Sequence, residues 1–340
     1  MNHDLTPINK NDTILNAQNG ADWQQAAHDW LTNFTSARTQ RAYRAAWINF
    51  LRFIDKTPAA VTSSDVLAYR HHLEHTPSSH TGRPLVASTI NQRLSALGSF
   101  FTFAIARGLL DKNPCKEVRQ MAVNPYGKAT WLDGEQQQDV QLLETIDRDT
   151  IQGQRDYAIL LIFLTTAVRV DAVARLRVNS LRFQGENIYL TYTNKGGKIA
   201  EKQLEPITAA AILDYLDTRG ELAPEAALFV ATARGRRVMN HLPHLAAKEG
   251  RAQNPLTART IEKLVKKYCD KAFGKGHGIT PHSLRHTAAM NAIIEGASVI
   301  EVSSLLQHKS IGITTIYLHA TDKAGDRISR KLGQRYADRI

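Results

Sequence analysis

A short segment near residue 280 combines a helix start with two side chains that bind anions. Thr280 is a good N-cap and Pro281 suits the first helical position, so ITPHSLRHTAA predicts a helix that begins there. His282 and Arg285 are three residues apart within its first turn. A helix N-terminus with a guanidinium beside it suits a phosphate. Taken alone, this pairing is weak evidence, and a structural role is the simpler interpretation.

Three further segments carry groups that could act on a phosphate diester. Arg169 follows the apolar run LLIFLTTAV, where an arginine serves either a buried carboxylate or an anionic ligand. Lys195 lies in the turn N-K-G-G-K, whose glycines would let it swing, although a solvated turn lysine is the simpler interpretation. His308 comes nine residues before Tyr317. Together with the first segment, these residues suggest chemistry on a phosphate.

Cleavage of a phosphodiester needs a nucleophile, charge neutralisation and a proton for the leaving oxygen. Tyr317 can supply the nucleophile, but its phenol has an ordinary pKa of about 10 and needs help to lose its proton. Arg169 and Arg285 can fork onto the non-bridging oxygens, which their planar geometry favours. Lys195 suits protonation of the leaving 5′ oxygen.

Histidines complete this set of groups. His282 would act as the base or proton shuttle near Tyr317, and His308 would donate a further hydrogen bond to the phosphate. His286 follows Arg285 and is expected to support the site without being one of the reacting groups. Because cations and a covalent step can do this chemistry, we expect neither a metal nor another cofactor.

In this order, the four segments resemble the tyrosine recombinase (phage integrase) family. The family has an arginine after an apolar helix, a lysine in a β-hairpin, an H-x-L-R-H box and an L-x-H-x-S-I-x-T-T-x-x-Y box. Here they read TTAVRV, TNKGGK, PHSLRH and LLQHKSIGITTIY. The resemblance implies a 3′-phosphotyrosyl intermediate, strand exchange and religation through a Holliday junction. It implies six catalytic residues, with Tyr317 as the nucleophile: Arg169, Lys195, His282, Arg285, His308 and Tyr317.

Two positions depart from the family pattern. The family often has an acidic residue three positions after its first arginine, where this chain has Ala172, with Asp171 one position early. The pair Gln307-His308 stands where the family usually has Gly-His. The first departure concerns which side chain supports Arg169. Neither departure removes a reacting group.

The segments that would position these groups have sequence patterns that predict a mainly helical fold with a small β-sheet. Residues 1–20 are polar and are expected to form a flexible arm. Apolar residues at helical spacing predict a bundle of four or five helices over residues 21–115. The resemblance implies that this bundle is the family's SAM-like core DNA-binding domain. Four arginines of this domain are expected to contact DNA: Arg38, Arg41, Arg44 and Arg93.

The remainder is expected to form a linker (116–130), a mixed α/β catalytic domain (131–320) and a C-terminal helix (321–340). The catalytic domain should open with a helix near 133–146. Alternating residues and the Asn194–Lys198 turn predict a β-hairpin whose second strand runs to Ile207.

Charge and composition indicate the partner. The chain has 43 Lys and Arg residues against 32 Asp and Glu residues, a net charge of +11. Such an excess usually serves a polyanion, most often a nucleic acid. The resemblance implies that this partner is double-stranded DNA with inverted-repeat half-sites. The longest nearly apolar run, Tyr157–Val168, is too short to span a membrane. Two cysteines, with no signal peptide visible, lead us to expect a cytoplasmic protein.

Several alternatives stay open. One is site-specific recombination by a tetramer on two DNA sites, each duplex held in a two-domain clamp. A second is topoisomerase-like nicking and closing, and a third is a regulator that has lost catalysis, which the complete set of six groups disfavours. His71 and His75 could bind a metal, although a solvated or DNA-facing surface is favoured. The C-terminal helix has an apolar stripe that either folds back on its own domain or docks into a neighbouring subunit: Ile328, Leu332, Tyr336 and Ile340.

Overall fold

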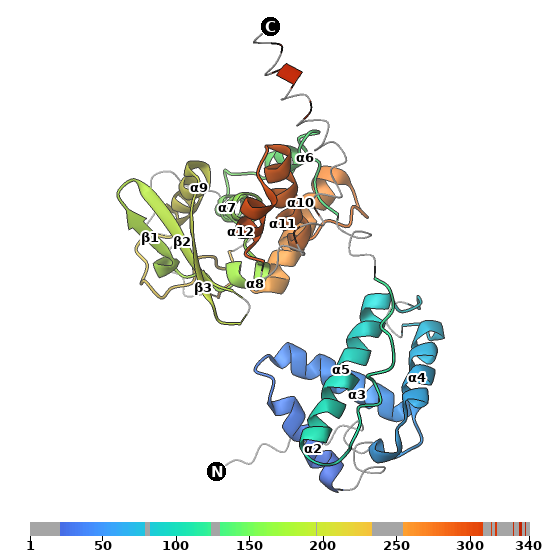
Figure 1. The fold of residues 1–340 in the computed structure, drawn as a ribbon. Helices are drawn as coiled ribbons and strands as arrows, with labels where there is room; N and C mark the ends of the chain where they lie inside the picture. The colour runs from blue at the N-terminus through green and yellow to red at the C-terminus, as the bar shows by residue number, and fades with distance from the viewer. Residues whose placement is uncertain are drawn as a thin grey trace, which may run out of the picture. The chain divides into compact units, whose positions relative to one another are not determined.

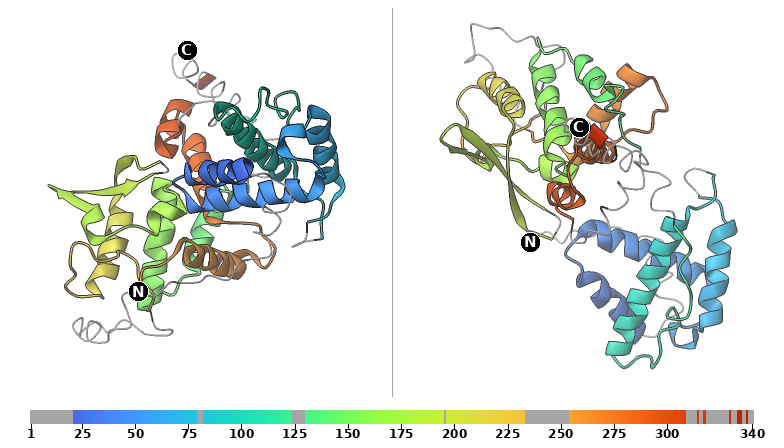
Figure 2. Two further views of the ribbon diagram at one scale, coloured as in Figure 1. Left: turned by 90° about the horizontal axis from the view of Figure 1, so that it is seen from below. Right: turned by 45° about the horizontal axis from the view of Figure 1, so that its top comes forward.

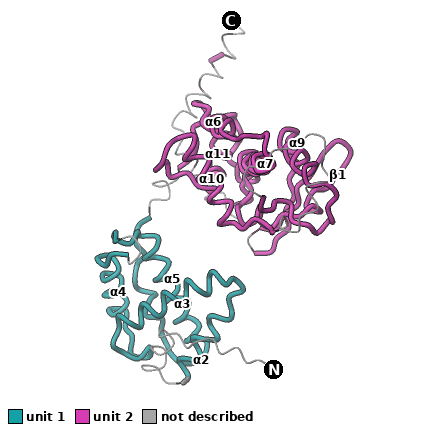
Figure 3. The backbone as a smooth tube through the Cα atoms, turned by 180° about the vertical axis from the view of Figure 1, so that it is seen from behind, with its two compact units in different colours: residues 1–124 teal, residues 125–340 magenta. Residues whose placement is uncertain are grey.

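The computed structural model describes residues 21–78, 82–123, 130–194, 196–232 and 254–308, together with the single positions 314, 317, 329, 333, 334 and 337. The chain divides into two compact units, residues 1–124 and residues 125–340. Figure 3 shows them in teal and magenta. Each unit has its own hydrophobic core.

The first unit is a helical bundle (Figure 1). Its elements are α2 (Ala21–Thr32), α3 (Ala37–Phe53), a short 3₁₀ turn η1 (Pro58–Ala60), α4 (Ser63–His75) and α5 (Ala87–Ala106). Helix α5 contacts each of the other three α-helices. The core is aromatic, with Trp47, Phe50 and Phe100 almost completely buried.

Capping side chains fix where these helices begin. Ser36 accepts a hydrogen bond from the backbone N–H of Thr39 at the start of α3. At α4, Thr62 and Asp65 form a reciprocal capping box. Local polar residues therefore set the helix boundaries, and the apolar stripe sets the packing.

The second unit combines helices with a three-stranded antiparallel sheet in the order β1-β2-β3. Its strands are β1 (Leu181–Gln184), β2 (Asn187–Thr193) and β3 (Ile199–Gln203). Its helices are α6 (Gln138–Glu144), α7 (Ile151–Thr166), α8 (Val170–Val173), η2 (Val178–Ser180), α9 (Pro206–Asp217), α10 (Ala258–Phe273), α11 (Pro281–Ile294) and α12 (Val299–Leu306). The expected mainly helical fold with a small sheet is confirmed.

Helix α7 forms the centre of this unit. It packs against α9 and α11, and its apolar residues are buried on nearly all sides. Figures 1 and 2 show α7 between the sheet and α10. Helix α11 is buried from Ser283 to Met290, so the H-x-L-R-H box lies mostly inside the protein. None of the described helices is long and apolar enough to cross a membrane.

Three boundaries in this unit differ from the sequence prediction. The second hairpin strand ends at Gln203, because Pro206 begins α9 and fixes the backbone for a helix. Helix α6 is shorter than the predicted 133–146, since Gln137 has a left-handed backbone (φ 55°). Strand β1 was not predicted, because only its first residue, Leu181, is buried and no alternation is visible.

Candidate active site

Arg169 is placed by the carboxyl end of α7. The helix ends at Ala167, whose N–H makes the last helical bond, to the carbonyl of Phe163, and whose own backbone is left-handed (φ 53°). Arg169 then caps α8 and donates from Nη1 to the side-chain oxygen of Asn194 at 3.2 Å. Ala172 is buried and offers no carboxylate to Arg169, whose guanidinium contacts the amide of Asn194.

Arg285 is placed by α11, which starts as predicted. Thr280 and Ser283 form its capping box, with Pro281 in the first turn. Arg285 is 4% exposed, and its guanidinium donates to two main-chain carbonyls, those of Ala167 and Leu306. Burial and the nearby Arg169 lower the pKa of Arg285 to about 10. A charged group so deeply buried requires such partners.

The end of α12 places His308. Gln307 follows the helix in a left-handed conformation (φ 49°), which explains why glycine suits this position in the family. Its side-chain oxygen accepts a hydrogen bond from the amide of Asn194, so the hairpin turn is tied to α12. The ring Nδ1 of His308 lies 2.9 Å from the hydroxyl of Thr314.

The hydroxyl of Tyr317 lies 2.6 Å from Nδ1 of His286. Tyr317 is 3% exposed, and burial raises its pKa to about 12, against the opposing influence of Arg285. Burial, with smaller contributions from His282 and Arg285, lowers the pKa of His286 to about 4. Both groups are therefore neutral near pH 7. In the tautomer with its proton on Nε2, His286 accepts the hydrogen of the phenol.

This contact changes the role expected for His286. The sequence indicated a supporting role for His286, and it assigned the position near Tyr317 to His282. In the structure the ring of His282 packs edge-on against His286, with centroids 4.3 Å apart. The two histidines are four residues apart on α11, and that spacing could have shown that they share a face.

Positive charge dominates the surroundings of the two other histidines. Partial desolvation, followed by Arg285 and Arg169, lowers the pKa of His282. The same influences, together with His282, lower the pKa of His308 to about 4. The permanently charged neighbours in both shifts are the two arginines. Such a cluster is electrostatically suited to an anion, which would raise both pKa values again.

Five of the six predicted catalytic residues thus lie among the described residues, on elements that meet at the ends of α7 and α12. Lys195 lies outside the described residues. Its neighbour Asn194 lies in the site and contacts both Arg169 and Gln307. The hairpin turn is therefore fixed to the site immediately before Lys195.

The arginines predicted to bind DNA belong to α3 and α5, which pack together. Arg38, Arg41 and Arg44 are exposed on α3. Arg93 on α5 is half-buried and donates to the side-chain oxygen of Asn49 at 2.9 Å. The structure therefore makes the three α3 residues accessible and holds the fourth against the α3–α5 contact.

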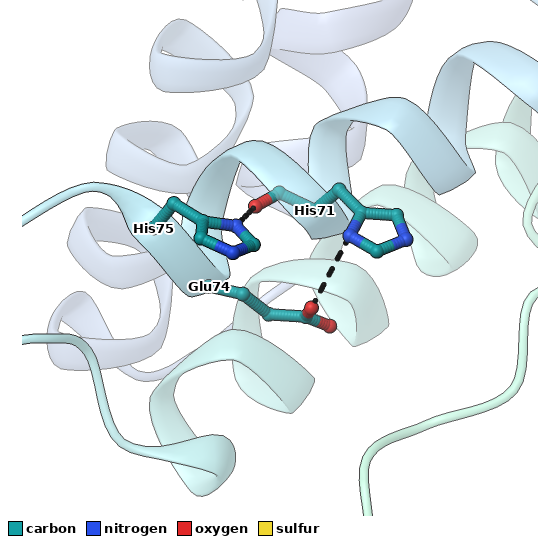
Figure 4. A group of neighbouring side chains, drawn as sticks. All are labelled: His71, Glu74 and His75. Atoms are coloured by element: carbon teal, nitrogen blue, oxygen red, sulfur yellow. Dashed lines mark hydrogen bonds and ion pairs between the residues drawn. The ribbon is translucent and has the colours of Figure 1, made fainter.

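Helix α4 carries a group of possible metal ligands that the sequence analysis did not complete. His71, Glu74 and His75 have ligand atoms within 4.8 Å of one another (Figure 4). The ring of His75 is 2.8 Å from the carbonyl of His71, and Arg70 is 3.1 Å from the Glu74 carboxylate. Because Arg70 competes for that carboxylate and both histidines are exposed, a solvated ion-paired surface remains the better description.

Comparison with known proteins places this site in a family. Residues 132–324 match the model of the phage integrase family, and residues 28–109 match the N-terminal SAM-like domain of phage integrases. The chain belongs to the phage integrase family. It is a tyrosine-type site-specific recombinase, an enzyme that cleaves and rejoins DNA.

Relatives of the recombinase include tyrosine recombinases named XerC. The one from Chlamydia trachomatis serovar L2 is 27% identical over 259 residues, which are 75% of this chain and 73% of the relative. The one from Listeria welshimeri is 28% identical over 290 residues, which are 84% of this chain and 88% of the relative. The likeness therefore extends over most of both proteins.

Solved structures share the fold of the recombinase. XerH in a post-cleavage complex with a palindromic difH substrate has a TM-score of 0.64 at 15% identity, covering 97% of this chain and 99% of that one. The Tn1549 transposon integrase with transposon right end DNA has a TM-score of 0.60 at 20% identity, covering 92% and 99%. A lambda integrase dimer on a core site has a TM-score of 0.59 at 15% identity, covering 85% and 94%.

Proposed function

We propose that Tyr317 of this recombinase attacks the scissile phosphate of its DNA site. The new bond joins the phenolic oxygen to phosphorus, and the bond from phosphorus to the 5′ oxygen breaks, which leaves a 3′-phosphotyrosyl enzyme. Strand exchange and religation through a Holliday junction follow. The observation that carries the proposal is the clustering of two arginines and three histidines around a buried tyrosine. Covalent trapping of DNA tests it, as argued in the Discussion.

Each group has a proposed part in this reaction. Arg169 and Arg285 neutralise the non-bridging oxygens, and His308 donates a further hydrogen bond to the phosphate. The phenol proton passes first to the histidine beside it, His286, and His282 serves as the next acceptor. A bound phosphate favours this transfer, because its negative charge raises the pKa of both rings. We assign protonation of the 5′ oxygen to Lys195.

The proposed substrate is double-stranded DNA with inverted-repeat half-sites, recombined by a tetramer on two such sites. We assign DNA contacts to the helical residues 21–115 and catalysis to residues 131–320, as two arms of a clamp, with residues 116–130 as the linker. The exposed α3 arginines and the match to an integrase SAM-like domain support this assignment. Two free cysteines, Cys115 and Cys269, support a reducing, cytoplasmic location.

DNA binding by the recombinase is expected to weaken steeply with salt. Contacts between cationic side chains and phosphates release counterions, so raising salt from about 50 mM to about 200 mM should lower affinity by more than about 10-fold. Replacing Arg41 with alanine should reduce the slope of log affinity against log salt by about one. Fluorescence anisotropy with a labelled half-site measures both. A flat salt response would contradict the basic clamp.

Truncation after Asp326 tests the proposed assembly. Residues 321–340 lie largely outside the described part of the chain, and we propose that their helix docks into a neighbouring subunit. The truncated protein should then bind a single half-site as the full chain does. Occupancy of paired half-sites should lose cooperativity, and recombination should fail.

Gel-shift titration on single and paired half-sites, with a recombination assay alongside, reads out these effects. Normal recombination by the truncated protein would show that the helix does not link subunits. Failure of the truncated protein to fold would place the apolar stripe in its own core.

A further inference from the structure

Lys202 occupies a position in β3 where the strand pattern calls for an apolar side chain. Its neighbours Glu201 and Gln203 are exposed, whereas Lys202 is half-buried and pairs in register with the fully buried Leu190. On the outer face, Glu201 forms an ion pair with Arg182. Lys202 thus points to the inner side of the sheet, where a charged group needs a specific reason.

The ammonium of Lys202 connects the ends of two helices. Its Nζ donates to the carbonyl of Thr166, at 2.7 Å, and to the carbonyl of Leu305. Thr166 is the last residue of α7, and Leu305 lies in the last turn of α12. Carbonyls at a helix carboxyl end lack partners within the helix and carry partial negative charge, so a cation suits them.

Arg285 makes a parallel connection one residue further along both helices. It donates to the carbonyls of Ala167 and Leu306, the next positions after those that Lys202 contacts. Two cations therefore bridge the same pair of helix ends side by side. Burial and the charge of Arg285 lower the pKa of Lys202 to about 8, so Lys202 still carries its proton near pH 7.

These helix ends carry residues of the catalytic cluster. Arg169 follows α7 by three residues, and His308 follows α12 by two. A change in the separation of the two ends would move both side chains, as well as the guanidinium of Arg285. We propose that Lys202 is a positioning residue for DNA cleavage, which holds the ends of α7 and α12 at the separation that Arg285 and the phosphate require.

This inference rests on the proposed function, because it takes Arg285 to bind the scissile phosphate. It assigns Lys202 no contact with DNA, since its ammonium is committed to main-chain oxygens. Lys202 is therefore distinct from Lys195 of the hairpin turn, which has the proposed role of proton donor.

Replacing Lys202 with methionine keeps the length of the side chain and removes its donors. Single-turnover cleavage of a nicked suicide substrate should fall by about 10-fold, because small displacements of a positioned group can lose up to about 100-fold in rate. Half-site affinity should not change. Lys271→Met is the matched control, because Lys271 also donates to a main-chain carbonyl at a helix end, that of Thr145, away from the cluster. The control should cleave at the wild-type rate.

A double-mutant cycle separates positioning from general destabilisation. If Lys202 acts through the Arg285 bridge, adding Lys202→Met to Arg285→Ala should slow cleavage much less than it slows the wild type. Equal slowing in both backgrounds, or wild-type cleavage by Lys202→Met, would overturn the proposal. Lys202→Gln, which retains two N–H donors, replaces the methionine variant if the latter unfolds, and it should cleave more slowly than wild type. Normal cleavage by Arg285→Ala alone would instead overturn the proposed function.

Discussion

Replacing Tyr317 with phenylalanine is expected to abolish covalent trapping of DNA and to leave DNA binding largely intact. The change deletes only the phenolic oxygen, which is the proposed attacking atom. Tyr317 is buried in a small apolar cluster, and phenylalanine fits the same space. The lost hydrogen bond to His286 should cost about 1 kcal/mol of stability. The fold should therefore survive while the chemistry is lost.

A suicide substrate nicked near the cleavage point gives the measurement, because the released strand prevents religation. Wild-type protein should produce a shifted band on a denaturing gel, and Tyr317→Phe should produce none. Tyr215→Phe is the matched control, since Tyr215 is also buried but bonds to the backbone of Val230. Tyr192 is the rival nucleophile, because Arg285 and Arg169 both influence its pKa. Trapping by Tyr317→Phe that disappears in Tyr192→Phe would move the nucleophile to Tyr192.

Replacing either arginine with alanine should slow cleavage by about 10²-fold or more, as loss of a preorganised charge donor does. Arg169→Ala removes a cation held by Asn194, and Arg285→Ala also leaves two helix-end carbonyls without their donor. The Arg285 variant should therefore lose thermal stability as well as rate. Single-turnover cleavage and thermal denaturation by circular dichroism separate the two effects.

Arg219→Ala is the control for these variants. Arg219 also donates to two main-chain carbonyls of this unit, those of Ala227 and Leu228, at 2.6 and 2.9 Å. It should lose stability without losing cleavage measured well below its melting temperature. Near-normal cleavage by both Arg169→Ala and Arg285→Ala would assign those arginines a purely structural role.

The sequence predicted the parts of the fold that local signals determine. The start of α11 followed from Thr280 and Pro281, because a capping residue acts within one turn. The match of the four boxes supplied the candidate catalytic residues. Strand β1 has no such signal. It forms because its four residues pair with β2, and their own sequence pattern does not predict a strand.

The contacts between segments could not be predicted in the same way. Asn194 contacts Arg169 and Gln307, which are 25 and 113 residues away. Nothing in the local sequence shows that the amide of Asn194 contacts these two residues. The same holds for the bond between His286 and Tyr317, which depends on how α11 packs beside the residues that follow α12.

The hydrogen bonds from Arg285 and Lys202 to main-chain oxygens determine which sequence changes the catalytic cluster can tolerate during evolution. A main-chain carbonyl is present whatever side chain a residue carries. A substitution at Thr166 or Leu305 leaves the acceptor in place as long as the helix still ends at the same residue. The positions of the two cations therefore depend on the lengths of α7 and α12 and not on the side chains at the ends of these helices. Inserting or deleting one residue in either helix turns its end by about 100°, because there are about 3.6 residues per turn, and so displaces acceptors that no point substitution removes.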